Sequence, residues 1–341
     1  MKYNDLNKKN VLIESGGGGI GDLIMFTPAL RRLKEIYPDC CLTFLTNEKN
    51  ADVLRRLPYI NSVVTIKKGG LFARLKVLPE LKKQDYMIFT EWQPHLMLAS
   101  WILRLPNRYS VPRMGNPVTR TLDKQITNTV SSSDLFAAET NAKMISELLD
   151  IRLDGDMTKC DVSLPDDRET KSAAALLEEI GIAPNDKFLL ISPFTGDAWR
   201  DWNLHEAKKL VNYINDKYHL PVLFIGNKKD NAVLEGISQY SLLQQTTLMQ
   251  LIAIIKRAGC IISCDSGPAH IAGALRVPCI DLFGRGWPSR WAPKHNCFPI
   301  FLNYDCCPCS DDLKKKCPYD YRCIRTITAD MVIDKLKQIL D

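Results

Sequence analysis

Short apolar runs alternate with amphipathic segments along the whole chain. Apolar runs of four or five residues are typical of strands that are covered on both faces, whereas a stripe of apolar residues with a period near 3.6 is typical of helices. Strands are predicted at residues 11–14, 42–46, 63–66 and 86–90 in the first half, and at 188–192, 222–225, 260–264 and 279–283 in the second. A helix is predicted at 205–217. This alternation predicts an α/β fold built on parallel, doubly wound sheets.

A polar stretch, residues 150–171, separates the two halves, and the pattern restarts after it. We therefore predict an N-terminal domain over residues 1–165 and a second domain over residues 166–325. Residues 326–341 form a terminal helix that could pack back on the first domain. Thr328 is placed to cap this helix, and Ile327 and Val332 stand at the positions of a hydrophobic staple.

The composition narrows the class of protein. The chain has 341 residues, of which 45% are hydrophobic, so disordered, collagen-like and coiled-coil classes are excluded for the whole chain. A net charge of +6 is too small for a dedicated nucleic-acid binder, and no nucleic-acid partner is expected. Fourteen basic and five acidic residues nevertheless lie between Lys49 and Lys124, an excess of nine. This excess predicts either an anionic partner, such as phosphate or a membrane surface, or an ordinary solvated face.

The sequence also bears on whether the chain has a secretory signal or a membrane-spanning segment. The first ten residues are polar, which is unlike a secretory signal, and no uncharged run approaches the roughly 18 residues that span a bilayer. We therefore expect a cytoplasmic protein, with peripheral attachment to a membrane left open.

A glycine-rich loop follows the first predicted strand. Gly16, Gly18 and Gly21 match the dinucleotide fingerprint, which raises the hypothesis of an NAD-dependent oxidoreductase. The acid expected about twenty residues later is missing, since Cys41 stands there. Asp22 would also place a second anion where the pyrophosphate must sit. Asp22 could instead act as a general base for a hydroxyl nucleophile, or simply cap the following helix.

A second candidate site for phosphate begins where the strand at 260–264 ends. Asp265 or Ser266 can cap the next helix, and Gly267 allows another molecule to approach the backbone closely. Free amides at that helix end would hold a diphosphate. His270 could donate to the same group, or be a partly buried helix histidine.

Two other segments are expected at the same edge of the sheet, because they also follow predicted strands. Thr195 and Arg200 follow the strand at 188–192, and Gly284 follows the strand at 279–283. Arg200, Arg285 and Arg290 are candidate counter-charges for phosphate, or ordinary surface arginines. Four tryptophans in these segments are interpreted as packing residues rather than base-stacking residues: Trp199, Trp202, Trp287 and Trp291.

Five of the twelve cysteines cluster near the C-terminus. Cys306, Cys309, Cys317 and Cys323 have the spacing C-x2-C-x7-C-x5-C, with Cys307 as a spare thiol. Four cysteines in a cytoplasmic protein suit a tetrahedral thiolate site for structural zinc or iron. The alternatives are a reduced cysteine-rich loop and disulfides that form during handling.

Taken together, these motifs resemble the ADP-heptose:lipopolysaccharide heptosyltransferases, which are glycosyltransferase family 9 enzymes of GT-B fold. The resemblance runs from about Val11 to Leu340. It rests on a set of motifs in both halves, in the same order as in the family: Gly21-Asp22, Thr27-Pro28-Ala29-Leu30, Asp265-Ser266-Gly267-Pro268-Ala269-His270, Leu282-Phe283-Gly284 with Trp291 beyond, and the terminal cysteines.

The resemblance implies two Rossmann-like domains that face each other across a cleft, and an inverting transfer of heptose from ADP-heptose to a hydroxyl of a lipopolysaccharide-core or related glycan. It implies no cofactor for catalysis. Asp22 would be the catalytic base, and Gly19 and Gly21 would lie in an acceptor-side loop of the first domain. The second domain would bind the nucleotide sugar through a donor set: Thr195, Arg200, Asp230, Asp265, Ser266, Gly267, His270 and Gly284.

The acceptor implied by the resemblance is an anionic glycolipid or glycan that docks on the basic first domain, at the cytoplasmic face of the inner membrane. Two segments depart from the family pattern. Residues 227–230 offer only Asp230 where the family often has an acid near the donor ribose, and Gly284-Arg285-Gly286 replaces the commoner Gly-Pro-Thr. The NAD-dependent oxidoreductase and a non-catalytic nucleotide-sugar-binding protein remain as alternatives.

Overall fold

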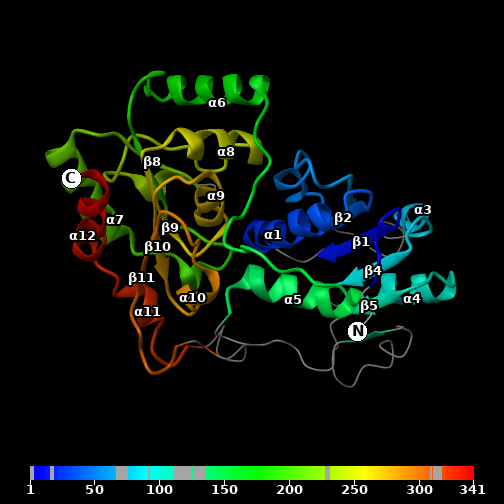
Figure 1. Ribbon diagram of the computed structural model, residues 1–341. Coiled ribbons are helices and arrows are strands. Elements are labelled where there is room, and N and C mark those ends of the chain that lie inside the picture. Colours follow the sequence, from blue (N-terminus) through cyan, green and yellow to red (C-terminus); the bar gives the residue numbers. More distant parts are fainter. Residues whose placement is uncertain are drawn as a thin grey trace. The chain divides into compact units, whose positions relative to one another are not determined.

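The computed structural model describes residues 4–15, 19–66, 76–90, 93–110, 124–125, 135–226, 231–307, 309 and 317–341 (Figure 1). The chain divides into two compact units, Met1–Ser163 and Leu164–Asp341. No helix within these described ranges combines the length and the apolar character needed to cross a membrane.

The first unit is built on one six-stranded parallel sheet, with the strand order β3-β2-β1-β4-β5-β6. Its strands are β1 (Asn10–Ser15), β2 (Cys41–Asn47), β3 (Ser62–Ile66), β4 (Tyr86–Phe89), β5 (Arg108–Ser110) and β6 (Lys124–Gln125). Its helices are α1 (Ile20–Ile36), η1 (Ala51–Val53), α3 (Leu78–Leu81), α4 (Pro94–Ile102) and α5 (Ala137–Leu149). The strand order reverses between β1 and β4, as in a dinucleotide-binding fold.

Helices cover both faces of this sheet. Helix α1 packs against α5, and residues of α3 and α4 join β1, β2 and β4 in an apolar cluster on one face. Helix α1 begins at Ile20, and Pro28 lies inside it. Gly19 is its N-cap residue, so the helix directly follows the glycine-rich segment of the sequence, as predicted.

The second unit holds a five-stranded parallel sheet with the order β11-β10-β9-β7-β8. Its strands are β7 (Leu189–Ser192), β8 (Val222–Phe224), β9 (Cys260–Cys264), β10 (Cys279–Phe283) and β11 (Cys297–Phe301). Its helices are α6 (Asp167–Glu179), η3 (Ala198–Arg200), α7 (Leu204–Tyr218), η4 (Asn231–Leu234), α8 (Leu248–Arg257), α9 (Gly267–Leu275), α10 (Pro288–Trp291), α11 (Arg322–Arg325) and α12 (Ala329–Leu340). Here the order reverses between β7 and β9, the position at which open α/β sheets bind ligands.

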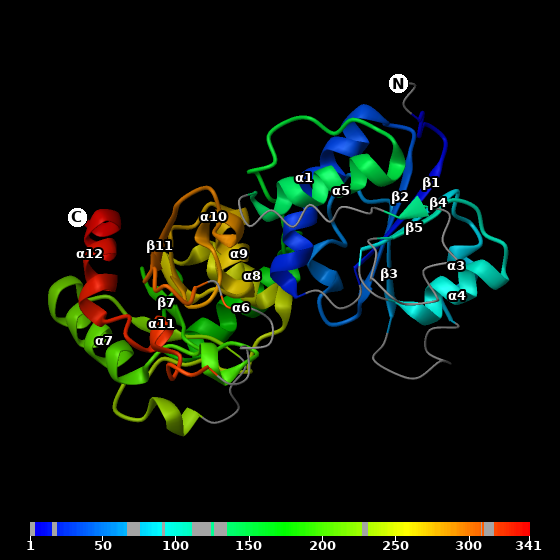
Figure 2. The same ribbon diagram turned by 90° about the horizontal axis from the view of Figure 1, so that it is seen from below.

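Helices α7 and α12 lie side by side against one face of this second sheet, and α8 and α9 contact each other, with α9 against β9 and β10 (Figures 1 and 2). Helix α6 packs on α8. Val332 and Leu336 of α12 are fully buried in the core of this unit, and Trp202 Nε1 donates to Ile327 O at 2.9 Å. The expectation that the terminal helix packs back on the first domain is therefore wrong, because its apolar stripe completes the core of the second unit.

All eight predicted strands are present, and β9 and β10 have the predicted bounds. Three strands were not predicted: β5, β6 and β11. The first two are only three and two residues long. Strand β11 contains Pro299, which interrupts the strand pattern. It is tolerated because β11 is an edge strand, where a missing N–H need not break a ladder hydrogen bond.

Candidate active site

The loops that follow β7, β9 and β10 meet at the carboxyl edge of the second sheet. They form a small pocket beside the β7–β9 reversal, and its lining residues come from all three loops and from α11: Trp199, Arg200, Cys264, Asp265, Leu282, Gly284, Arg285, Cys323 and Ile324. The structure thus brings together Arg200, Asp265 and Gly284, which the sequence placed in one donor site.

The start of α9 is open to a ligand. Ser266 is the extended N-cap residue, but its side chain makes no capping hydrogen bond. Its hydroxyl instead donates to Cys264 O at 2.8 Å. Pro268 has no N–H, and Ala269 N donates to Ser266 O at 3.1 Å. The N–H of Gly267, at a position with no side chain of its own, is therefore the amide with which this end of the helix can receive an anionic group.

His270 lies one turn into α9 and is almost completely buried. Its Nε2 is 3.9 Å from Asp265 Oδ1, which is too long for a hydrogen bond, and its Nδ1 has no hydrogen-bond partner among the described residues. Burial lowers the pKa of His270 to about 4. The imidazole is therefore neutral at physiological pH, and it can serve a ligand as a neutral hydrogen-bond donor.

Arg200 is the last residue of the short 3-10 helix η3, and it lines this pocket. One of its terminal nitrogens is 3.5 Å from Asp197 Oδ2, while its Nε is buried without a hydrogen-bond partner within the described part of the chain. Thr195 stabilises the same loop, because its backbone N donates to Asp201 Oδ1 at 2.6 Å and its hydroxyl donates to Asp197 O at 2.7 Å. Thr195 therefore shapes the loop that presents Arg200.

Gly284 allows the cysteine-rich segment to approach the end of β10. A Cβ atom at this position would lie 3.2 Å from Cβ of Ile324 and 3.5 Å from Sγ of Cys323. Cys307 Sγ is 3.6 Å from Gly284 O. The pocket and the cysteine-rich segment are thus in direct contact.

Asp22 occupies the third position of α1 in the first unit, and Gly21 beside it is buried. Its Oδ2 accepts a hydrogen bond from Gly19 N at 2.7 Å, so the carboxylate does cap the helix. An anion in this position disfavours the binding of an NAD pyrophosphate at the same helix end. Gly16 and Gly18 lie outside the described residues, as does Asp230.

The clustered cysteines are free thiols. The pKa of Cys309 is raised by burial and by its neighbours Cys306 and Cys317, and the pKa of Cys323 is raised by burial and then by Cys309. The four predicted ligands are therefore close enough to interact. In the described ranges, however, no three His, Cys, Asp or Glu side chains are arranged so that they could hold a metal ion.

Two residues were missing from the predicted donor set. Arg285 was considered only as one of several counter-charges, and the structure places it in the pocket beside Arg200. From the sequence, Arg290 has the same candidate role as Arg285. In the structure, however, the Cζ atom of Arg290 is 5.2 Å from the centroid of the Trp291 ring. Tyr321 carried no sequence signal at all, and it stacks on Trp199. Trp199 lies more than a hundred residues from Tyr321, and Arg200 lies 85 residues from Arg285, so no local pattern could predict these contacts.

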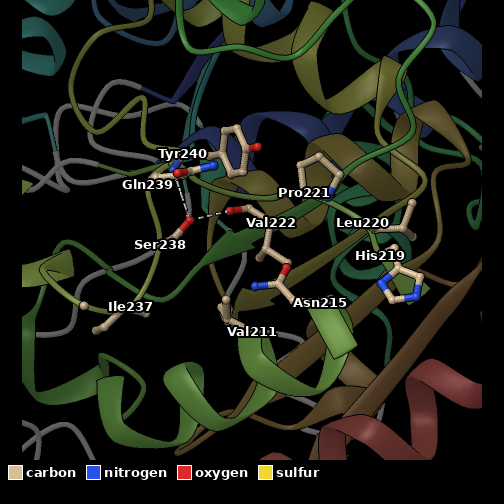
Figure 3. A pocket seen from close by; sticks show the side chains of 11 residues that line it. Val211, Asn215, His219, Leu220, Pro221, Val222, Ile237, Ser238, Gln239 and Tyr240 are labelled. Carbon is tan, nitrogen blue, oxygen red and sulfur yellow. Dashed lines mark hydrogen bonds between the residues drawn. The ribbon is translucent and has the colours of Figure 1, made fainter. Parts of the chain in front are cut away.

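A larger hollow of about 680 Å³ lies at the amino end of β8 (Figure 3). It contains none of the predicted site residues, and its lining residues carry no Asp, Glu, Lys or Arg: Val211, Asn215, His219, Leu220, Pro221, Val222, Gly236, Ile237, Ser238, Gln239 and Tyr240. Ser238 Oγ donates to Val222 O at 2.8 Å across its floor. Without a fixed charge, this hollow is a poorer site for a diphosphate than the pocket at the carboxyl edge.

Comparisons with known proteins show what this chain is similar to. In sequence, the chain is 24% identical over 337 residues to "Lipopolysaccharide heptosyltransferase 3" of Escherichia coli (strain K12), covering 94% of this chain and 95% of that protein. In structure, it is similar to the glycosyl transferase family 9 protein from Veillonella parvula DSM 2008, with a TM-score of 0.84, 17% identity and 99% of both chains covered.

A third similar protein is the dodecameric iron-containing heptosyltransferase TibC from enterotoxigenic E. coli H10407, solved in complex with ADP-D-beta-D-heptose. The TM-score is 0.65 at 15% identity, and the alignment covers 99% of this chain and 79% of that one. These similarities confirm the predicted GT-B fold.

The family model described as "Glycosyltransferase family 9 (heptosyltransferase)" matches residues 74–321, which is more than half of the chain. The matched region contains the whole pocket up to Gly284 and Arg285, and the cysteines from Cys306 to Cys317. With the fold, the pocket and the family model in agreement, the chain belongs to glycosyltransferase family 9, the family of the heptosyltransferases.

Proposed function

We propose that this protein is an inverting heptosyltransferase that moves heptose from ADP-heptose to a hydroxyl of a lipopolysaccharide-core or related glycan. The observation that carries the proposal is the pocket at the β7–β9 reversal, where Arg200 and Arg285 lie beside the uncapped start of α9. Guanidinium groups and helix N-termini both favour phosphate oxygens. The names of the relative in E. coli and of TibC, together with the ADP-heptose bound to TibC, support heptose as the sugar.

In the proposed reaction the second unit holds the donor. Arg200, Ser266, Gly267 and neutral His270 bind and orient the diphosphate. Asp22 of the first unit takes the proton from the acceptor hydroxyl, whose oxygen attacks the anomeric carbon. The bond from that carbon to the phosphate oxygen breaks, and ADP leaves with the electron pair. Positive charge and backbone amides around the diphosphate stabilise the negative charge that develops on it.

Further assignments complete the proposal. Thr195, Gly284 and Asp230 belong to the donor site, with Asp230 near the ribose. Gly19 and Gly21 belong to the acceptor-side loop, and residues 1–165 and 166–325 are the acceptor-side and donor-binding domains. The basic excess between Lys49 and Lys124 supports an anionic glycolipid acceptor, and with it a place at the cytoplasmic face of the inner membrane.

Binding and transfer assays test the function directly. Calorimetric titrations should show binding of ADP and ADP-heptose and no tight binding of NAD, with UDP-glucose as the control donor. Incubation with ADP-heptose and a heptose-deficient core glycan should then release ADP and add one heptose mass to the glycan. Tight binding of NAD without binding of ADP-heptose would support the oxidoreductase instead. Binding of ADP-heptose without transfer to any core acceptor would support a non-catalytic binding protein.

We also propose that Cys306, Cys309, Cys317 and Cys323 hold one structural zinc or iron ion. Four thiolates fit either ion, and the iron in TibC is a precedent within similar folds. Burial, followed by neighbouring thiols, raises the pKa of Cys309 and Cys323, so a bound cation would relieve the repulsion between thiolates at this place. A fully coordinated ion would cross-link residues 306–309 to 317–323, and it would take no part in catalysis.

Elemental analysis of protein purified under reducing conditions should find one equivalent of zinc or iron. Cys317→Ser should lose most of the metal and lower the melting temperature, because the segment beside the donor pocket loses its cross-link. Cys41→Ser is the matched control, since Cys41 is a partly exposed cysteine outside the cluster, and it should keep the full metal content. A wild-type protein that contains neither metal would overturn the assignment.

A further inference from the structure

Two arginines share one indole ring in the donor pocket. The Cζ atom of Arg200 is 5.7 Å from the centroid of the Trp199 ring, and the Cζ atom of Arg285 is 5.3 Å from the same centroid. The two positions are separated by the whole β8–β10 region, so only the fold brings them together. Both distances are within the range of a cation–π contact. The pocket therefore presents two guanidinium groups that contact the same aromatic ring.

This arrangement has an electrostatic cost when no ligand is bound. The Arg285 guanidinium is partly buried and lies over the Trp199 ring. Burial and the neighbouring charge of Arg200 lower the pKa of Arg285, and Asp265, Cys309 and Asp197 only partly oppose them. The buried Nε of Arg200 also has no hydrogen-bond partner among the described residues. Two partly desolvated cations side by side are stabilised most by an anion that binds both of them.

We propose that Arg285 is a second diphosphate-binding residue of the donor site, and that Trp199 is the positioning residue that aligns Arg285 with Arg200. The proposal rests on the proposed function, because it assigns the nucleoside diphosphate of that donor as the shared anion. Each guanidinium can bind two phosphate oxygens, so the pair matches a diphosphate better than it matches a single carboxylate.

Trp199 is itself held by the cysteine-rich segment. The rings of Trp199 and Tyr321 are stacked, with centroids 5.4 Å apart and an interplanar angle of 26°. The backbone N of Tyr321 donates to Cys317 Sγ at 3.4 Å, and Cys323 of the same segment lines the pocket. The segment that carries the cysteines therefore acts as a support for the ring on which both arginines lie.

Calorimetry measures the affinity for ADP directly, and the affinity for adenosine by competition with ADP. Comparing the two affinities separates the loss of a diphosphate contact from a general effect on folding. For Arg285→Ala we expect ADP affinity to fall about 10- to 100-fold, as for the loss of charge-assisted hydrogen bonds, with adenosine affinity unchanged. Arg285→Lys should recover only part of the loss, because an ammonium cannot bind two oxygens in a fork. Arg257→Ala is the matched control, because the Cζ atom of Arg257 is 5.3 Å from the centroid of the Phe188 ring and Arg257 does not line the pocket. This variant should keep the wild-type affinities for ADP and adenosine.

The role of Trp199 has its own readouts. Trp199→Leu should weaken ADP binding several-fold, and it should raise the KM for the donor more than it lowers kcat. Trp199→Phe should keep most of the wild-type affinity for ADP, because phenylalanine retains an aromatic ring. The double variant Trp199→Leu/Arg285→Ala should lose less than the sum of the two single losses, because the ring acts through the arginine. A purely structural ring would instead lower the affinities for ADP and adenosine equally, and strictly additive losses would also contradict a positioning role.

The outcomes distinguish this inference from the proposed function. If Arg285→Ala binds ADP as tightly as the wild type while Arg200→Ala loses affinity, then the second arginine is not a ligand and the donor site stands without it. If the wild-type protein binds ADP no better than adenosine, then the assignment of a nucleotide-diphosphate donor fails as well.

Discussion

Replacement of Asp22 by asparagine is expected to slow heptose transfer about 10²- to 10⁴-fold, the usual contribution of a general base. The amide cannot take a proton from the acceptor hydroxyl. Its oxygen can still accept the hydrogen bond from Gly19 N, so α1 should keep its cap. The affinity for ADP-heptose should change less than two-fold, because the donor residues belong to the second unit. Steady-state transfer rates and calorimetry measure the two quantities.

A matched control separates catalysis from capping. Glu139 occupies the third position of α5 in the same unit, and its Oε2 accepts from Phe136 N at 3.2 Å, which is the same type of capping contact. Glu139→Gln should therefore match Asp22→Asn in thermal stability while retaining full activity. If Asp22→Asn also retained full activity, then the carboxylate would be a helix cap alone, and the proposed base would be wrong.

Asp281→Asn is expected to stabilise the protein near neutral pH. Asp281 is fully buried in β10, and neither carboxyl oxygen has a hydrogen-bond partner among the residues that the structure describes. Burial, followed by the charge of Asp265, raises its pKa well above 3.8. The native state therefore keeps a proton that the unfolded chain releases above pH 3.8, so the free energy of unfolding of the wild type falls as the pH rises.

Asparagine has nearly the same shape and does not titrate in this range. The advantage of the variant over the wild type should therefore be small near pH 4 and grow by about 1.4 kcal/mol for each pH unit until the native pKa is reached. His270 acts in the opposite sense: its pKa of about 4 makes the protein lose stability as the pH falls from 6.5 to 4. Both proteins contain His270, so its contribution cancels in the difference.

Urea unfolding followed by the fluorescence of buried Trp202 reports on the core of the second unit. Asp216→Asn, at an exposed position on α7, is the control and should show no pH-dependent difference from the wild type. A variant less stable than the wild type at pH 7.5 would mean that Asp281 is ionised and has a partner in the native protein.

Local patterns predicted most of the secondary structure because they reflect local physics. The bounds of β9 and β10 follow from short, mostly apolar runs that end at glycine, proline or aspartate, and the start of α12 follows from the Thr328 cap and the staple of Ile327 and Val332. Where a pattern was short or broken, as in β5 and at Pro299 of β11, the strand was missed. Strands β5 and β11 form because they pair with β4 and β10, and the local sequence does not indicate this pairing.

The pocket at the carboxyl edge of the second sheet was only partly predictable. Because the carboxyl ends of parallel strands share one edge of a sheet, the sequence could place Arg200, Asp265 and Gly284 together, and the structure confirms this. It could not separate Arg285 from Arg290, since both follow the same strand. The fold turns Arg285 toward Trp199 and Arg290 toward Trp291, a difference of packing that no spacing rule contains.

By itself, the sequence determined the alternation of strands and helices, the two-part organisation, the family, and the three loops that meet at one edge of the second sheet. These depend on residue type and spacing along a few consecutive positions. Only the tertiary structure decided that the terminal helix completes the second core, that His270 is buried and neutral, and that Tyr321 supports the ring shared by two arginines. Each of these depends on burial and on contacts between distant segments, and those exist only once the chain has folded.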